Sequence, residues 1–289
     1  MRRITAALVF AAVILLCSCG QPAHLQNSEA PMDTKAEAHL SPDDNNEANG
    51  SAKESEEESP EQPGGTEIVI ATFNIKYGAE GLEKIAQAIS DVSPDIIGLE
   101  EVDVNCERSG NTDEPAELAR LAGYPYYAFA KAIPLGGGEY GTAILSRYPI
   151  ESFEVIPLES GNSEKRSVGH AVVSVDSLKL DVLVTHLSYE NRSVRIEQMK
   201  TIGRMLEGFD HYVLTGDFNC FDLEEIVNLG GAYYVNRTDR RYSTFRRFEG
   251  FSPDNIVVSG DFTEFASGMS DAECSDHRLL YATFLLNVE

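Results

Sequence analysis

The sequence is poor in positive charge. It has 23 Lys and Arg residues against 47 Asp and Glu residues in a chain of 289. Of the formal net charge of −24, residues 1–66 account for −7, which leaves −17 for residues 67–289. Lys and Arg that neutralise phosphates supply most of the affinity of proteins for nucleic acid. A protein this acidic is therefore expected to repel DNA and RNA at long range.

The few cations are unevenly distributed. One short stretch contains Arg237, Arg240, Arg241, Arg246 and Arg247. These arginines could form a local basic cleft, or they could offset nearby acids on a solvated surface. The sequence leaves both interpretations open.

Long hydrophobic runs are also scarce. The apolar stretch from Thr5 to Leu16 follows Arg2-Arg3 and is too short to cross a bilayer, which is typical of a signal peptide. It continues into LCSC, residues 16–19, which resembles the lipobox of bacterial lipoproteins. That resemblance implies cleavage before Cys19 and lipidation of Cys19. An ordinary secretory signal that contains cysteines is the alternative.

Residues 20–66 have almost no large apolar side chains and include the acidic run ESEEES. Such a segment cannot bury enough surface to offset its ordering entropy, so we expect a disordered linker. The predicted organisation is a lipoprotein signal peptide at 1–19, an acidic linker at 20–66 and a catalytic domain at 67–289. A lipid at Cys19 would tether this domain to the bacterial membrane or cell surface, outside the cytoplasm, without a membrane-spanning segment.

The predicted domain contains three cysteines, Cys106, Cys220 and Cys274. Export permits disulfides, and Cys220 and Cys274 lie beside two polar motifs that are expected to converge. A Cys220–Cys274 disulfide is therefore one hypothesis. Free buried cysteines are common, and they are the alternative.

Short runs rich in Val, Ile, Phe and Tyr predict strands throughout the domain. They occupy residues 67–73, 96–99, 126–130, 142–146, 168–175, 180–185, 212–215, 255–259 and 281–286. Apolar residues at helical spacing predict helices from Leu82 to Ile89 and from Ile196 to Leu206, and Pro115 suits the first turn of another. Strands alternate with helices early and pair directly later. This order predicts one α/β domain in which helices cover mixed sheets.

Acidic, amide and imidazole side chains lie at the ends of several predicted strands. They are Asn74, Glu101, His186, Asp217, Asn219, Asp254, Asp276 and His277. Ligand sites in α/β sheets gather at strand ends, and oxygen ligands suit a hard divalent cation. Histidine beside a carboxylate is a good proton carrier near neutral pH. Taken singly, each group has a simpler explanation, such as an Asx turn at Asp217 or a strand end that reaches solvent at Glu101.

Seven motifs in a fixed order resemble the endonuclease/exonuclease/phosphatase superfamily, which includes DNase-I-like nucleases and neutral sphingomyelinases. They are TFNI (72–75), DIIGLEEV (95–102), YGTAILSRYPI (140–150), THLS (185–188), LTGDFN (214–219), PDNIVVS (253–259) and SDHRLL (275–280). The chain looks like a bacterial lipoprotein member of this superfamily. The resemblance implies a four-layer α/β sandwich, in which two packed mixed β-sheets are flanked by helices.

The resemblance also implies roles for individual residues. Glu101 is the expected main ligand of Mg²⁺, with Mn²⁺ as an alternative ion, and Asn74 and Asp276 assist it. Asp217 is expected to orient or deprotonate the attacking water, and Asn219 to hold water or phosphate. The chain departs from the family at Glu100, where Gln is common.

The remaining implied roles concern phosphate and substrate binding. His277, oriented by Asp254, is expected to bind the phosphate and stabilise developing charge. His186 is expected to donate to a phosphate oxygen, with Glu139 as its partner, and Arg166 to contact the substrate. His170, inside a strand, is interpreted as structural.

The predicted function is a monomeric, membrane-tethered, Mg²⁺-dependent hydrolase that cleaves phosphoesters, and phosphodiesters in particular. The acidic charge favours a phospholipid or a small phosphodiester as substrate over nucleic acid. A nuclease that acts on extracellular nucleic acid is the first alternative. A surface lipoprotein that has kept the fold only as a binding module is the second.

Overall fold

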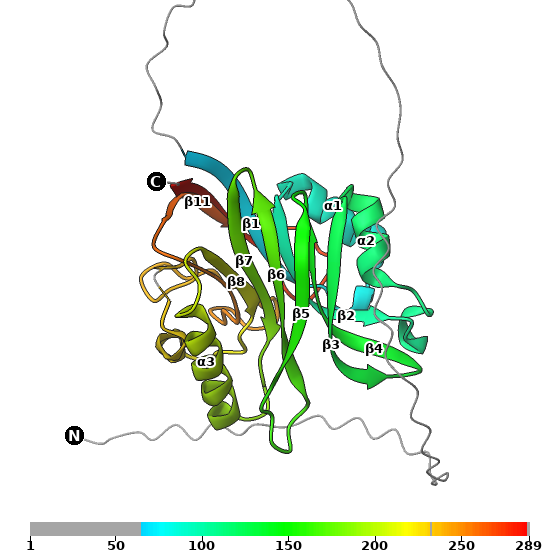
Figure 1. Cartoon of the computed structure of the whole chain (residues 1–289). Helices are drawn as coiled ribbons and strands as arrows, with labels where there is room; N and C mark the ends of the chain where they lie inside the picture. Colours follow the sequence, from blue (N-terminus) through cyan, green and yellow to red (C-terminus); the bar gives the residue numbers. More distant parts are fainter. Residues whose placement is uncertain (1–64, 232, 288–289) are drawn as a thin grey trace, which may run out of the picture. The chain divides into compact units, whose positions relative to one another are not determined.

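A computed structural model describes residues 65–231 and 233–287 of the chain (Figure 1). The predicted signal peptide, the lipidation site at Cys19 and almost all of the predicted linker lie outside these residues. The first strand begins at Gly65, two residues before the predicted start of the domain. No helix in the described part of the chain is long and apolar enough to cross a membrane.

Two six-stranded mixed sheets form the centre of the domain. Sheet A has the strand order β11-β12-β1-β2-β4-β3, and sheet B has the order β5-β6-β7-β8-β10-β9. Sheet A contains β1 (Gly65–Asn74), β2 (Ile96–Val104), β3 (Tyr126–Leu135), β4 (Gly138–Ser146), β11 (Phe262–Met269) and β12 (Leu280–Asn287). Sheet B contains β5 (Ile150–Leu158), β6 (Arg166–Val175), β7 (Leu178–His186), β8 (Tyr212–Asp217), β9 (Tyr233–Tyr234) and β10 (Asp254–Val258). The pairs β1–β2 and β7–β8 are parallel, and the other paired strands are antiparallel.

Alternating side chains along the strands build two separate apolar layers on each sheet. In β1, Ile68 and Ile70 join Val182 of sheet B in the core between the sheets, whereas Ala71 and Phe73 face the helices. Successive residues of a strand point to opposite faces, so one strand serves both layers. Gly98 allows the sheets to approach, because a Cβ there would lie only 2.0 Å from Thr215 Oγ1.

Helices cover the outer face of each sheet. The helices α1 (Leu82–Val92) and α2 (Glu114–Ala122) pack on sheet A, and α3 (Arg192–Leu206) packs on sheet B with the 3₁₀ helix η3 (Leu223–Leu229) (Figure 1). Two further 3₁₀ turns are η1 (Lys76–Gly78) and η2 (Glu107–Ser109). The layers run helix, sheet, sheet, helix. This confirms the predicted four-layer α/β sandwich.

The helix limits follow from local chemistry. Asp113 caps α2 by accepting a hydrogen bond from Ala116 N, and Pro115 occupies the first turn, where its missing N–H costs nothing. Gly123, with φ of 75°, ends the helix in the left-handed conformation that favours glycine. In α1, the buried Ile85, Ala86 and Ile89 are the residues whose spacing predicted the helix.

Each predicted strand is present, but three of the observed strands were not predicted. They are β5, β9 and β11, which lie at sheet edges or pair on one side only. An edge strand such as β5 is largely exposed and has no simple apolar pattern. In α3, the buried face includes Arg195 and Gln198, and the predicted apolar position Ile196 is only half-buried.

The Cys220–Cys274 disulfide hypothesis is wrong. Both residues and Cys106 are free and buried. Cys220 packs with α3 and sheet B, whereas Cys274 packs with the helices on sheet A. The two thiols therefore belong to different apolar layers and act as small apolar side chains.

Candidate active site

The two parallel strand pairs deliver polar residues to one edge of the sandwich. In sheet A, Asn74 at the end of β1 is paired with Glu100 of β2. In sheet B, His186 at the end of β7 is paired with Asp217 of β8, which is also paired with Asp254 of β10. Carboxyl ends of parallel strands meet at the same sheet edge. The sequence expectation that these groups converge is met.

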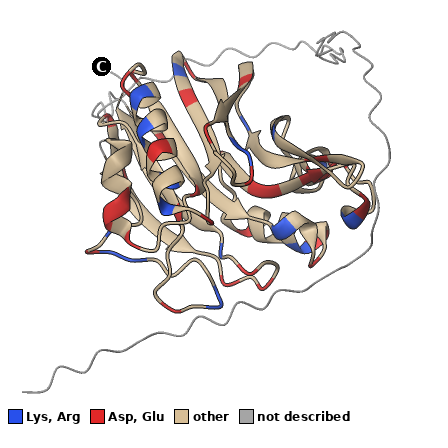
Figure 2. Cartoon of the chain, turned by 90° about the horizontal axis from the view of Figure 1, so that it is seen from below, with Lys and Arg blue, Asp and Glu red and all other residues tan. Residues whose placement is uncertain are grey.

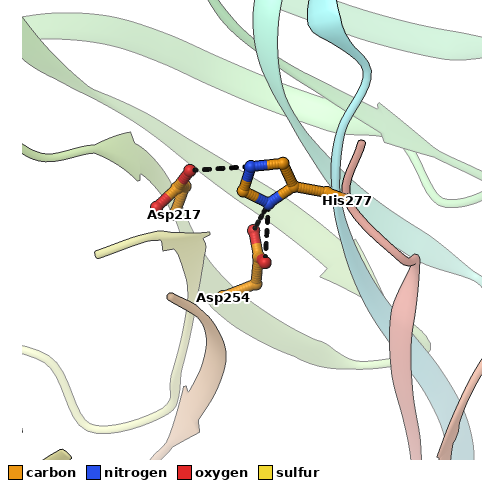
Figure 3. Close-up of side chains that lie close together, drawn as sticks. All are labelled: Asp217, Asp254 and His277. Atoms are coloured by element: carbon orange, nitrogen blue, oxygen red, sulfur yellow. Dashed lines mark hydrogen bonds and ion pairs between the residues drawn. The ribbon is translucent and has the colours of Figure 1, made fainter. Parts of the chain in front are cut away.

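His277 lies between two buried carboxylates (Figure 3). Its Nδ1 is 2.9 Å from Asp254 Oδ2, and its Nε2 is 3.7 Å from Asp217 Oδ2. Phe245 packs edge-on against the ring, with the centroids 4.9 Å apart. Asp254 thus orients the imidazole so that Nε2 points toward Asp217, as the family resemblance implied for this pair.

Electrostatics favours the charged form of His277. Burial alone would lower the pKa of His277, but the adjacent Asp254 and Asp217 carboxylates outweigh burial and raise it. Burial and the nearby Asp254 charge raise the pKa of Asp217. His277 therefore keeps its charge, while Asp217, whose pKa is raised toward neutral, is suited to proton transfer near neutral pH.

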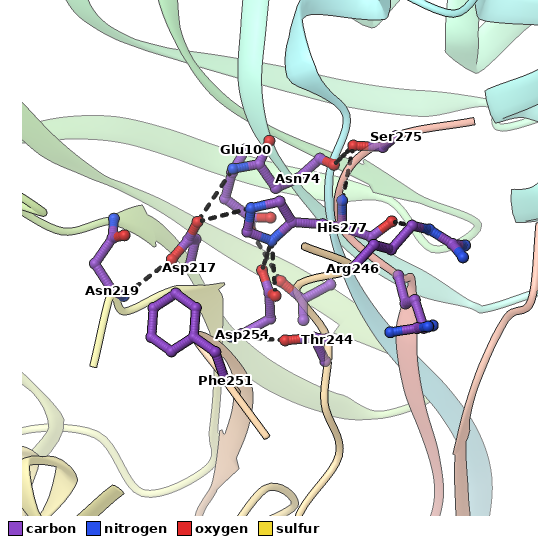
Figure 4. A network of polar contacts seen from close by, with 12 residues as sticks. Asn74, Glu100, Asp217, Asn219, Thr244, Arg246, Phe251, Asp254, Ser275 and His277 are labelled. Atoms are coloured by element: carbon purple, nitrogen blue, oxygen red, sulfur yellow. Dashed lines mark hydrogen bonds and ion pairs between the residues drawn. The ribbon is translucent and has the colours of Figure 1, made fainter. Parts of the chain in front are cut away.

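The Asn74 amide joins the two halves of the site (Figure 4). Its Nδ2 donates to Glu101 Oε1 and to Asp217 Oδ2, each at 3.1 Å. Asp217 Oδ1 also accepts from the backbone N–H of Asn219, whose side chain donates to Leu187 O. These bonds fix the Asp217 carboxylate in one orientation.

A β-bulge separates the two neighbouring acids Glu100 and Glu101 in the middle of β2. The register shifts between Glu100 and Val102, and Glu101 has φ of 55°. Bulges re-aim side chains in this way. Glu101 consequently lines the pocket, whereas Glu100 is fully buried beneath it.

Glu100 is an unusual buried acid. Its Oε1 accepts from Thr72 Oγ1 at 2.8 Å, but its Oε2 has no hydrogen-bond partner among the described residues. Burial and the charges of Asp254 and Asp217 raise the pKa of Glu100 well above the ordinary value. The family's usual Gln would be neutral here, so the substitution places an acidic proton or an uncompensated charge under the site.

A pocket of about 370 Å³ opens over these groups. Seven predicted site residues line it, namely Glu101, Arg166, His186, Asp217, Asn219, Asp276 and His277. Asn74 and Asp254 lie behind them and hold Asp217 and His277 by the bonds described above. Arg166 is almost fully buried and pairs with Glu164 at 3.1 Å.

The expected Glu139–His186 pairing is not the arrangement found. The Glu139 carboxylate is 2.6 Å from Lys131 Nζ, and both side chains of this pair are half-buried. His186 Nδ1 is buried and has no hydrogen-bond partner within residues 65–231 and 233–287, and its Nε2 lies 3.6 Å from Asp217 Oδ2. Burial and the Arg166 charge lower the pKa of His186, so its imidazole is neutral and able to donate one hydrogen bond.

Sequence reasoning missed the aromatic wall of the pocket. Tyr140, Tyr189, Phe221, Phe245 and Phe251 line it, and Phe221 stacks on Phe251 with the centroids 4.8 Å apart. Tyr140 could have been identified from the sequence, because it is the first residue of the motif YGTAILSRYPI. The phenylalanines lie on irregular loops, where no periodic pattern marks them. His170 is bonded to Glu154 and Asp181 and does not line the pocket, as expected of a structural residue.

The donors present fit a divalent cation. Asp217, Asp254 and His277 offer ligand atoms that all lie within 4.8 Å of one another. On the other side of Asn74, the Glu101 and Asp276 carboxylates face the same pocket, and Lys76 Nζ lies 3.2 Å from Asp276 Oδ2. Carboxylate and amide oxygens are the ligands that Mg²⁺ prefers. Asp217, Asp254 and His277 thus form a compact donor group, and Glu101 and Asp276 are further carboxylates in the same pocket, of which Asp276 also pairs with Lys76 and Arg247.

Comparisons with known proteins agree with this arrangement. The model of the "Endonuclease/Exonuclease/phosphatase family" matches residues 71–277, which is well over half of the chain. The uncharacterized protein YbhP of Escherichia coli strain K12 is 26% identical over 176 residues, covering 55% of this chain and 70% of YbhP.

Several solved structures share the fold. An endonuclease/exonuclease/phosphatase from Beutenbergia cavernae is 24% identical with a TM-score of 0.61, covering 76% of this chain and 72% of that one. The mannosyl-6-phosphatase Bt3783 of Bacteroides thetaiotaomicron is 16% identical with a TM-score of 0.57, covering 75% and 99%. TDP2 of D. rerio, complexed with single strand DNA product, is 19% identical with a TM-score of 0.59, covering 76% and 99%. With its fold, its buried Asp/His cluster and the family match all in agreement, the chain belongs to the endonuclease/exonuclease/phosphatase family.

Proposed function

We propose that this protein is a Mg²⁺-dependent phosphodiesterase that hydrolyses its substrate by in-line attack of water. The observation that carries the proposal is the Asp217 carboxylate, which Asn74 and Asn219 orient and which faces both His186 and His277 in one pocket. A carboxylate held in this way can take a proton from a water that enters the pocket.

Each neighbouring group has a defined task. His277, kept charged by Asp254, stabilises negative charge that develops on a phosphoryl oxygen. His186, held neutral, donates to another oxygen. Arg166 adds a fixed positive charge from the pocket wall. Because these donors are in place before substrate arrives, little reorganisation accompanies the reaction.

In this proposal the metal binds on the side of the pocket that Glu101 lines. Asn74, Glu101 and Asp276 would hold Mg²⁺ or Mn²⁺, which when bound neutralises charge on the phosphoryl oxygens. The bridging Asn74 amide then links the metal side to Asp217. Asn74 Oδ1 accepts from Lys76 N at 3.1 Å, so an ion that took the amide oxygen as a ligand would replace this bond.

The substrate in this proposal is a phospholipid or another small phosphodiester. The aromatic wall suits an apolar substituent on the phosphate, and the charge of −17 over residues 67–289 disfavours a long polyanion. A nuclease is the second candidate, because the structurally similar TDP2 was solved with a DNA product. We further propose a location outside the cytoplasm, supported by the lipobox-like sequence that ends at Cys19.

The test is metal-dependent cleavage by the full-length protein. The panel contains sphingomyelin, a phosphoinositide, plasmid DNA and bis(4-nitrophenyl) phosphate. Cleavage of at least one substrate, abolished by EDTA and restored by Mg²⁺ or Mn²⁺, is expected. Cleavage that persists in EDTA, or Mg²⁺-dependent cleavage that survives Asp217→Asn unchanged, would contradict the mechanism.

A further inference from the structure

A second polar pocket lies directly beside the catalytic one. It has a volume of about 460 Å³ and is lined by Ser243, Phe245, Arg246, Glu249, Met269, Asp271 and Arg278. Phe245 also lines the catalytic pocket, so this ring separates the two. Arg246 lies on the side of His277 that faces away from Asp217 and Asn219 (Figure 4).

Most arginines of the 237–247 stretch have acidic partners. Arg237 pairs with Asp239 at 2.8 Å, and Arg240 forms a two-pronged pair with Glu264. Arg247 Nη2 lies 3.4 Å from Asp276. Figure 2 likewise shows Lys and Arg interspersed with Asp and Glu over helices and loops. For these three arginines, the interpretation that they offset nearby acids is the one that the structure supports.

Arg246 and Arg278 differ. In residues 65–231 and 233–287, no carboxylate oxygen lies within 4.0 Å of either guanidinium. Backbone carbonyls hold both in place: Arg246 Nε donates to His277 O at 3.3 Å and its Nη2 to Ala272 O, while Arg278 Nη1 donates to Ser243 O at 2.7 Å. Arg246 Nη1 and Arg278 Nε and Nη2 have no partner within the described part of the chain.

The backbone sets the two arginines on either side of His277. Arg246 N donates to Asp276 O at 2.8 Å, and Arg278 N donates to Thr244 O at 2.7 Å. Both arginines line the same pocket, and burial, followed by the charge of Arg278, lowers the pKa of Arg246. Like charges held together with free donors favour a bound anion, and guanidinium geometry matches phosphate and carboxylate.

We propose that Arg246 and Arg278 form an anion subsite that receives a second anionic group, a phosphate or a carboxylate, of the substrate whose phosphoester lies at His277. The identity of the occupant as substrate rests on the proposed function. Glu249 and Asp271 line the same pocket, and their charges restrict it to one compact anion rather than a polyanion. The preferred substrate is therefore a small phosphoester with a second negative group a short distance from the first.

The first experiment measures binding in the full-length Asp217→Asn variant, in which turnover is blocked. Calorimetry compares phenyl phosphate, inorganic phosphate and a series of alkanediol bisphosphates with spacers of increasing length. One bisphosphate is expected to bind at least about tenfold more tightly than phenyl phosphate, since charge-assisted bonds to a guanidinium are among the stronger ones. Equal affinity across the series overturns the proposal.

Arginine variants then locate the effect. Arg246→Gln and Arg278→Gln are each expected to remove the bisphosphate preference, and Arg278→Lys to keep part of it. Arg241→Gln is the matched control, because Arg241 lies in the same stretch, bonds only to Gly250 O and does not line the pocket. Thermal melts identify variants that fail to fold. If Arg278→Gln is unfolded, the bisphosphate preference of Arg246→Gln alone tests the subsite. A preference that survives Arg246→Gln in a folded protein overturns the subsite.

Further outcomes distinguish a free anion from an anionic group of the substrate, and the subsite proposal from the catalytic proposal. If inorganic phosphate binds as tightly as the best bisphosphate and depends on Arg246, the pocket takes free anions and the assignment to substrate is wrong. If the wild type cleaves no phosphoester but the Arg246-dependent preference is present, the subsite stands and the catalytic proposal fails. If phosphoesters are cleaved without any bisphosphate preference, the catalytic proposal stands and the subsite fails.

Discussion

Both sheets bring the end of a parallel strand pair to the site, but their buried acids differ in whether they have a cationic partner. In each sheet, the pairing of two parallel strands ends at the pocket: β1 with β2 in sheet A, and β7 with β8 in sheet B. On the side of sheet B, Asp254 is paired with His277 and Glu225 with Arg195. On the side of sheet A, the buried Asp103 pairs with Arg108, but Glu100 and Glu114 have no cation within ion-pair distance in the described part of the chain.

This difference indicates that the two halves of the site have different roles. In the sheet B half, the buried Asp254 and Glu225 have cationic partners, and in the proposed mechanism the groups of this half move a proton and donate hydrogen bonds. The sheet A half has excess carboxylate, with Glu101 in the pocket and Glu100 directly beneath it. Unpaired buried carboxylates are costly, and a cation nearby offsets that cost. The predictions below test this contrast, from the largest expected effect to the smallest.

The largest effect is expected from Asp217→Asn. Loss of a general base costs about 10²- to 10⁴-fold in rate. Asn keeps the size of Asp217 and one of the two hydrogen bonds that its carboxylate accepts from Asn74 and Asn219. We expect a fall of about 10³-fold in kcat with the melting temperature unchanged or higher, since burial already raises the pKa of Asp217. Steady-state kinetics and a thermal melt check this. A loss of less than tenfold would remove Asp217 from the proton-transfer role.

The next effect is expected from Glu101→Gln, on the metal side. Replacement of a charged ligand by a neutral one weakens the site for Mg²⁺, so activity at low Mg²⁺ should fall by about 10²-fold. Raising the Mg²⁺ concentration should recover part of the activity, because the remaining ligands are intact. Asp217→Asn serves as the control that added metal does not rescue. Failure of metal to restore any activity to Glu101→Gln would contradict its role as a ligand.

A stability effect is expected from Glu100→Gln. Burial raises the pKa of Glu100 well above its ordinary value, and Glu100 Oε2 lacks a partner. A neutral amide removes the cost of the carboxylate, so the free energy of unfolding without metal at pH 8 should rise by about 1–3 kcal/mol. Urea denaturation measures it. Destabilisation by Gln would show that the charge at Glu100 is compensated in the metal-free protein.

The smallest effect concerns the pH dependence of stability. Burial raises the pKa of Glu114 from 4.5 to about 7, and its Oε2 accepts from Asp103 N. Between these values the folded state holds a proton that the unfolded state releases, so stability falls as the pH rises from about 4.5 through 7. Glu114→Gln should reduce the stability lost between pH 5 and pH 8 by about 1–3 kcal/mol. An unchanged pH profile would show that Glu114 is not the titrating group.

Much of this molecule was predictable from the sequence, for identifiable reasons. The strands of the two sheets are apolar runs, and the site groups follow them directly, so Asn74, Glu101, His186 and Asp217 could be expected at one edge. The bridging role of Asn74 could not, because it depends on the relative position of two sheets. Glu139 was assigned to the wrong partner because Lys131 approaches it across the neighbouring strand.

Polar residues on apolar faces and irregular loops account for the other misses. Arg195 is buried on α3 because Glu225 neutralises it and Ser188 O accepts from it, a combination that no periodic pattern reveals. The loop phenylalanines that line the pocket have no neighbours in sequence that mark them. The pairing of the arginines in 237–247 likewise depends on acids far away in the chain, such as Glu264 and Asp276.

The most direct test of the division between the two halves is the affinity of the protein for the metal itself. Calorimetric titration of Mg²⁺ or Mn²⁺ would compare the wild type, Glu101→Gln and Asp217→Asn in the absence of substrate. If the metal binds on the sheet A side, Glu101→Gln should weaken the affinity of the protein for the metal by at least about tenfold. Asp217→Asn should change this affinity little. The reverse result would place the ion on Asp217, Asp254 and His277 and contradict the account.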